Sequence, residues 1–100
     1  MPPAHDDKFF LDDDADLPFE RGLSDFLGVG VQLASATWTV SDATLLETHD
    51  AAIIESGQTA RVWLRALNKT GNCFVTCHFE TNETPPRKDE RTWLVMVRER

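Results

Sequence analysis

The sequence predicts an all-β protein: an immunoglobulin-like β-sandwich of about six or seven strands, preceded by an irregular acidic N-terminal arm. Three observations support this fold class. From Val31 onward, apolar and polar residues alternate in several short segments. Turn residues separate these segments at intervals of roughly 8 to 12 residues, and no segment carries the spacing of a long amphipathic helix. We therefore assign residues 1–16 to the arm and residues 17–100 to one sandwich domain.

The arm is acidic but carries one apolar cluster, Phe9-Phe10-Leu11. Its charge favours a solvated tail, whereas the cluster favours a segment that docks on a neighbour, in the same chain or in another. We predict Phe9, Phe10 and Leu11 as interface residues. The surrounding aspartates are Asp6, Asp7, Asp12, Asp13, Asp14 and Asp16.

Residues 17–30 connect the arm to the first alternating segment. Leu17-Pro18-Phe19 is predicted to be extended, because proline disfavours the helical conformation in the residue before it. Residues 24–27 fit one helical turn, which Gly28-Val29-Gly30 then ends.

Residues 31–56 are predicted to form the first strands of the sandwich. Residues 31–40 alternate, and Trp38 on their inward face would form the centre of the core. Two shorter strands are expected at residues 44–47 and 51–56. The other residues predicted to face inward on the first of these strands are Ala34, Ala36 and Val40.

The second half of the sandwich has the clearest alternation, in residues 59–67 and 72–81. Residues 68–71 carry the turn chemistry of a hairpin between them. A final strand at residues 89–98 is apolar enough in its middle to be covered on both faces. The predicted inward residues of the first two strands are Ala60, Val62, Leu64 and Ala66, and Cys73, Val75, Cys77 and Phe79.

The outward face of the predicted strand at residues 59–67 carries Arg61, Trp63 and Arg65. Arginine and aromatic residues are enriched at the centres of protein interfaces. We predict these three residues as part of an interface between subunits. The alternative is that loops or the arm of the same chain cover them.

Charge and hydropathy limit the partners of the chain. Residues 1–50 carry eleven acidic residues against Lys8 and Arg21, a balance of −9, and residues 51–100 carry six acidic and eight basic residues, a balance of +2. An acidic first half repels phosphate, so we expect no nucleic-acid partner.

No stretch reaches the ~18 apolar residues of a membrane span, and residues 1–7 lack the apolar segment of a secretory signal. We expect folding in the cytosol and no membrane partner.

The two cysteines, Cys73 and Cys77, fall on one predicted strand. Four residues of extended chain separate their Cα atoms by about 13 Å, whereas a disulfide requires ~4.4 to 6.8 Å. We predict two reduced thiols in the core.

Candidate chemistry is sparse. A metal site of His49, Asp50 and His78 can be drawn, but the spacing is not that of a ligand set, and Asp12 to Asp16 lack the glycine and final glutamate of a calcium loop. No nucleophile or phosphate-binding motif is present. We expect no catalytic residue, no metal and no cofactor.

Three sequence blocks occur in a fixed order. The first is Phe26-Leu27-Gly28 with LASATWTV at residues 33–40, the second is TARVWL at residues 59–64, and the third is DERTWL at residues 89–94 with VRER at residues 97–100. Together they resemble a family of small phage structural proteins described as fibre–tail adaptors. The chain departs from the family in its arm and at residues 65–71, where the family is usually rich in glycine.

The resemblance implies an immunoglobulin-like virion protein that is present in several copies near the tail, has no catalytic residues, and is made in the bacterial cytoplasm. Its partners would be other virion proteins (tail, connector or fibre subunits), bound through sheet edges, the arm and the face around Trp63. Two alternatives stay open: a capsid decoration protein, whose arm could be loose, and a carbohydrate- or ligand-binding module that uses Trp63 and Trp93.

Overall fold

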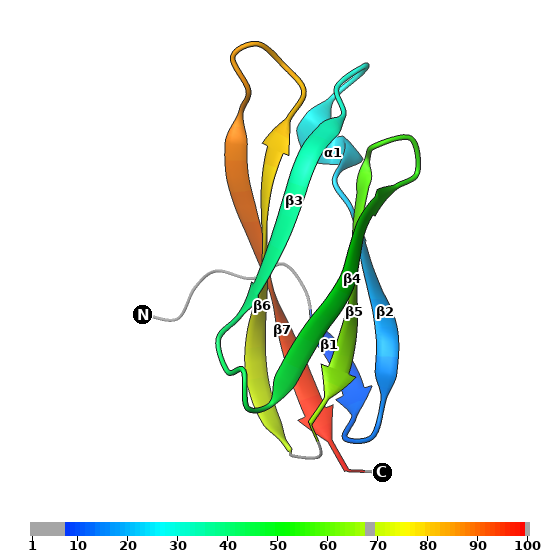
Figure 1. Cartoon of the computed structure of the whole chain (residues 1–100), viewed down its shortest axis with the longest axis vertical. Coiled ribbons are helices and arrows are strands. Elements are labelled where there is room, and N and C mark those ends of the chain that lie inside the picture. The colour runs from blue at the N-terminus through cyan, green and yellow to red at the C-terminus, as the bar shows by residue number, and fades with distance from the viewer. Residues whose placement is uncertain (1–7, 68–69, 100) are drawn as a thin grey trace.

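Seven strands and one short helix form two packed sheets in the computed structural model, which describes residues 8–67 and 70–99 (Figure 1). Sheet A has the strand order β1-β7-β6-β3, and sheet B has the order β2-β5-β4. The all-β sandwich predicted from the sequence is therefore confirmed. The elements are β1 (Lys8–Asp12), β2 (Asp16–Gly22), α1 (Ser24–Leu27), β3 (Leu33–Val40), β4 (Leu46–Ile54), β5 (Thr59–Ala66), β6 (Gly71–Thr81) and β7 (Lys88–Arg98).

The core lies between the sheets and is filled by alternate residues of each strand. On β5 and β6, all eight residues predicted to face inward are buried. Because successive side chains point to opposite faces of a strand, this alternation leaves Arg61, Trp63 and Arg65 on the outside of sheet B.

Phe19 on β2 occupies the centre of the aromatic core and is 1% exposed. Its ring centroid lies 5.1 Å from Phe9, 5.9 Å from Trp38 and 5.6 Å from Trp93, each in an edge-to-face arrangement. The prediction that Trp38 forms the core centre was wrong, because β3 is an edge strand and Trp38 is only half-buried.

Arg21 covers this aromatic cluster from the side of β2. It pairs with the buried Ala60 and therefore points toward the interior. Its guanidinium carbon lies 4.0 Å from the centroid of Phe19 and 5.8 Å from those of Phe9 and Trp93. These distances are those of cation–π contacts.

The predicted irregular arm is corrected from Lys8 onward. Residues 1–7 lie outside the described residues, but Lys8–Asp12 form β1, which pairs in parallel with β7. Leu11 is 2% exposed, and Phe9 packs against the core. The segment is ordered as a strand because these two alternate side chains fill the space beside Phe19.

Strands β3 and β4 differ from their predicted form. An irregularity in the pairing of β3 between Leu33 and Ser35 places Leu33 in the core and leaves Ala34 exposed, so the inward position predicted for Ala34 was wrong. The two short strands expected over residues 44–56 form one strand, β4. Its pairing with β5 is irregular between His49 and Ala52.

The connection from β5 to β6 is not a hairpin. Asn68 and Lys69 lie outside the described residues, but β5 belongs to sheet B and β6 to sheet A. The chain therefore crosses between the sheets at this point. Within residues 8–67 and 70–99, no helix is long and apolar enough to span a membrane.

Three connections are joined at the end of the sandwich that is uppermost in Figure 1, where α1 and the loops β4–β5 and β6–β7 meet. The backbone N–H of Gln32 donates to Asn82 Oδ1 (3.1 Å), and its side-chain Nε2 donates to the carbonyl of Ser56 (2.9 Å). Arg87 donates from Nη2 to the carbonyl of Leu27 (3.1 Å). Arg87 thus holds the end of α1, the helical turn predicted from the sequence, against the β6–β7 loop, and Gln32, which follows α1, joins both loops.

Candidate functional site

The six residues predicted to form an interface lie in three different environments. Leu11 belongs to the core, and Phe9 packs against it. Phe10, their neighbour on β1, is 65% exposed on the outer side of sheet A. Arg61, Trp63 and Arg65 lie on the outer side of sheet B. The structure therefore does not join these residues into one interface, and Leu11 is unavailable to another protein.

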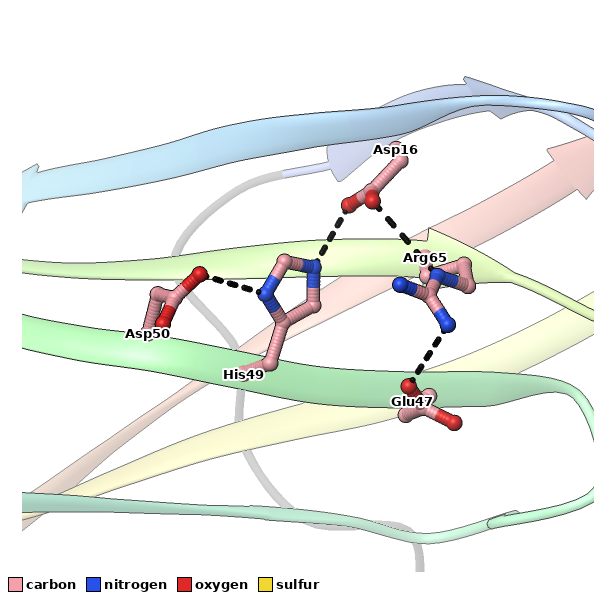
Figure 2. A network of polar contacts seen from close by, with 5 residues as sticks. All are labelled: Asp16, Glu47, His49, Asp50 and Arg65. Carbon is pink, nitrogen blue, oxygen red and sulfur yellow. Dashed lines mark hydrogen bonds and ion pairs between the residues drawn. The ribbon is translucent and has the colours of Figure 1, made fainter.

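The outer side of sheet B carries a network of ion pairs, which we call the charged face (Figure 2). The two arginines come from the middle strand β5, and the histidine and the acidic residues come from the edge strands β2 and β4. The charged face comprises Asp16, Glu20, Glu47, His49, Asp50, Arg61, Trp63 and Arg65.

Arg65 is held between the two edge strands. Its Nε lies 3.5 Å from Asp16 Oδ2 on β2, and its Nη1 lies 3.1 Å from Glu47 Oε1 on β4. Arg61 has a looser pair, with 3.9 Å between its Nη1 and Glu20 Oε2. Exposed pairs of this kind contribute little stability each, so their main effect is to orient the arginines.

His49 binds two carboxylates at once. Its Nε2 lies 2.8 Å from Asp16 Oδ1, and its Nδ1 lies 2.9 Å from Asp50 Oδ2. The hydrogen bond with Asp16, followed by the bond with Asp50, raises the pKa of His49 above its ordinary value of 6.5. The hydrogen bond with His49, supported by Arg65, lowers the pKa of Asp16.

Trp63 lies under His49, with which it pairs across β5 and β4. The two rings are stacked, with 6.0 Å between their centroids and 27° between their planes. On its other side Trp63 pairs with Pro18 of β2. Strand β1 of the predicted arm does not cover Trp63, because β1 belongs to sheet A.

The charges of the charged face are paired with one another. His49 is bonded through both ring nitrogens, and no serine, cysteine or threonine of the described network lies within reach as a nucleophile. The acidic partners neutralise Arg61 and Arg65, so this surface is not a basic patch for phosphate.

The outer side of sheet A carries an apolar row that sequence reasoning missed in part. It consists of Phe10 on β1, Leu94 and Met96 on β7, and Phe74 on β6, which are adjacent because Phe10 pairs with Met96, and Leu94 with Phe74. Phe10 is exposed, and the other three are half-buried. The apolar middle of β7 was the signal for this face, since a strand apolar on both sides needs a second cover.

The other half of this outer side is polar. His78 on β6 lies 3.0 Å from Glu90 Oε2 through Nδ1 and 3.1 Å from Thr39 Oγ1 through Nε2. An open groove of about 490 Å³ runs beside it. The groove is lined by Ser35, Thr37, His78, Phe79, Glu80, Lys88, Asp89 and Glu90.

The remaining predicted groups are separated or buried. His49 lies on sheet B and His78 on sheet A, so the metal site drawn from both does not exist, and His5 lies outside the described residues. Cys73 and Cys77 are free and buried in the core. Trp93 is only 3% exposed, which removes it from the predicted carbohydrate site.

Comparisons with known proteins give a fold and no family. No family model matches the sequence, and no curated protein matches it. Among solved structures, the chain is similar to the cysteine protease inhibitor EhICP2 from Entamoeba histolytica, with 10% identity, a TM-score of 0.53, and coverage of 91% of this chain and 85% of that one. The solution structure of Amebosin matches with 13% identity and a TM-score of 0.35, over 91% and 88% of the two chains. The first neighbour is described as an inhibitor, not an enzyme, and at 10% identity the likeness shows a shared small β fold.

Proposed function

We propose that the chain is a structural protein of a bacteriophage virion, an adaptor that joins tail, connector or fibre subunits without catalysis. The order of the three sequence blocks supports this proposal, since they resemble the fibre–tail adaptor family. Much of each block lies in strands β3, β5 and β7.

The observation that carries a binding role is the apolar row on sheet A. Phe10 is 65% exposed and continues into Met96, Leu94 and Phe74. A contiguous exposed apolar surface favours contact with another protein. An adaptor requires at least two such contacts, and the charged face on sheet B offers a second surface on the opposite side.

The particle itself provides the test. A phage that encodes this chain would be purified by density gradient, and an antibody against the chain would locate it by immunogold labelling. Label at the tail or at the head–tail junction supports the adaptor role. Label over the whole capsid favours the decoration alternative, and absence of the chain from purified particles contradicts both.

Two matched variants test the surface. Phe10→Asp should remove the chain from particles, because it places a charge in the apolar row. Val29→Asp alters another exposed apolar residue, in the loop after α1, and should leave incorporation unchanged. Equal incorporation of both variants would contradict a role for the apolar row.

A further inference from the structure

The four edge strands of the sandwich differ in how well they are protected against pairing with another strand. On β2, Pro18 lacks an amide hydrogen and Arg21 points inward. On β4, the pairing is irregular and Asp50 has a positive φ of 52°. Strand β1 has only five residues. Each of these features discourages the addition of a further strand.

Strand β3 lacks these features over residues 35–40, since its pairing irregularity lies at its start, between Leu33 and Ser35. Its eight residues, LASATWTV, include no charged residue and no proline. Its pairing with β6 is regular from Ser35 to Val40. It also ends sheet A, so no described strand pairs with its other side. An edge of this kind is a template for a strand from another chain.

The direction of the backbone groups follows from one hydrogen bond. The amide of Ser41 donates to the carbonyl of Phe74 on β6 (2.9 Å). In an antiparallel pair, every second residue faces the partner strand in this way. The intervening residues, Ala36, Trp38 and Val40, therefore direct their amide and carbonyl groups toward the open edge.

A pocket of about 260 Å³ opens beside this edge, between β3 and β4. Its apolar lining comes from Ala36, Trp38, Ala51 and Val62, and its polar lining from Thr37, Thr48, His49 and Asp50. In paired strands, residues opposite each other project to the same face. A residue of an added strand opposite Trp38 would therefore direct its side chain toward this pocket.

The alternate residues of an added strand would project to the outer side of sheet A, next to Thr37. The groove on that side contains Glu80, Asp89 and Glu90 against one lysine, Lys88. Basic side chains fit this balance of charge.

We propose that the open edge of β3 binds an extended segment of another protein as an added strand of sheet A, with apolar side chains toward the pocket and basic side chains toward the groove. This is the binding mode in which main-chain hydrogen bonds supply affinity and alternate side chains supply specificity. The proposal specifies the side chains of the partner and not its origin, so its test does not depend on whether the chain is a virion protein.

The test uses the full chain and a synthetic peptide of the length of β3 in which valine alternates with lysine. Binding should slow the hydrogen exchange of the Ala36, Trp38 and Val40 amides, measured by NMR. A peptide in which valine alternates with glutamate should bind at least about tenfold more weakly, because it meets the acidic groove.

Three variants complete the test. Ala36→Pro removes one edge amide without touching the bonds to β6, and should weaken binding about tenfold, the equivalent of one hydrogen bond. Ala51→Phe fills the pocket and should weaken binding similarly. Ala43→Phe, at an exposed alanine of the β3–β4 turn, is the matched control and should bind normally. Urea unfolding would establish that all three are folded.

Two results would overturn the proposal. The first is that the peptide does not bind at the β3 edge. This would be seen as no binding at millimolar peptide, as protection of another edge strand, or as binding that Ala36→Pro does not weaken. The other is a dimer of the chain that Ala36→Pro converts to monomer, which would make a second copy the occupant of this edge.

Discussion

His49 on β4 and Asp16 on β2 are joined across the middle strand of sheet B, with 2.8 Å between His49 Nε2 and Asp16 Oδ1. The two residues are far apart in sequence, and their strands are not neighbours in the sheet. Their contact therefore ties both edges of sheet B together above Trp63, and its strength depends on the charges of both groups.

This contact predicts a pH window of stability. The raised pKa of His49 means that its contribution is complete below 6.5 and is lost as pH rises through the raised value. The lowered pKa of Asp16 means that its contribution is complete above 3.8 and is lost as pH falls through the lowered value. The stability advantage of the chain over a His49→Gln variant should therefore be greatest between these two values.

Urea unfolding from pH 3 to pH 9 would measure this advantage (roughly the span of both titrations). An Asp16→Asn variant provides the control, since replacing His49 in that background should have a smaller effect. A constant difference between the chain and His49→Gln over the whole range would contradict the prediction.

Truncation to alanine should lower the free energy of unfolding much more at Leu11 than at Phe10. Leu11→Ala should cost about 2 to 5 kcal/mol in the free energy of unfolding, because it leaves a cavity beside the core. Phe10→Ala should change this free energy by only about 0.5 kcal/mol, because its side chain is exposed. Chemical unfolding of both variants measures the difference, and equal losses would show that residues 8–12 do not pack as a strand.

Cys77 should be inert while the chain is folded. Burial raises the pKa of its thiol from 9.0 to about 12, and both cysteines are buried and free. A thiol-specific reagent at pH 8 should therefore react only at the rate of unfolding. An Ala43→Cys variant provides an exposed thiol for comparison, and rapid reaction of the unmodified folded chain would contradict the buried position.

Arg21 should matter more to stability than Arg65. Arg21→Lys keeps the charge but loses the planar contact with Phe19, and should cost about 1 to 2 kcal/mol. Arg65→Lys changes an exposed pair and should cost less than about 1 kcal/mol. The comparison of unfolding free energies is decisive, since equal costs would mean that Arg21 acts only as a surface charge.

Local alternation predicted most of the sandwich but not how its strands are distributed between sheets. The inward residues of β5 and β6 were identified correctly because both strands are regular and half-buried. The connection between them was misassigned because a hairpin and a crossing between sheets use the same turn residues. Pairing partners are set by tertiary packing, which a single strand does not encode.

The candidate site was harder to predict, since it depends on pairs that are distant in sequence. The outward position of Arg61, Trp63 and Arg65 was predicted correctly because they lie on one regular strand. Their partners Asp16 and His49 were missed, because the first belonged to the assumed arm and the second to an assumed loop. Leu11 was misplaced for the same reason: a short parallel strand surrounded by aspartates gives little local signal.

The position of β7 has a consequence for synthesis of the chain. This last strand lies between β1 and β6, so sheet A is divided into two separate parts until the ribosome has released β7. Until then, β1 has no strand partner and β6 has only β3, because β7 pairs with both β1 and β6. The sandwich should therefore complete its folding only after β7 has been synthesised, and nascent chains that stop before Lys88 should be exposed to proteases and to aggregation.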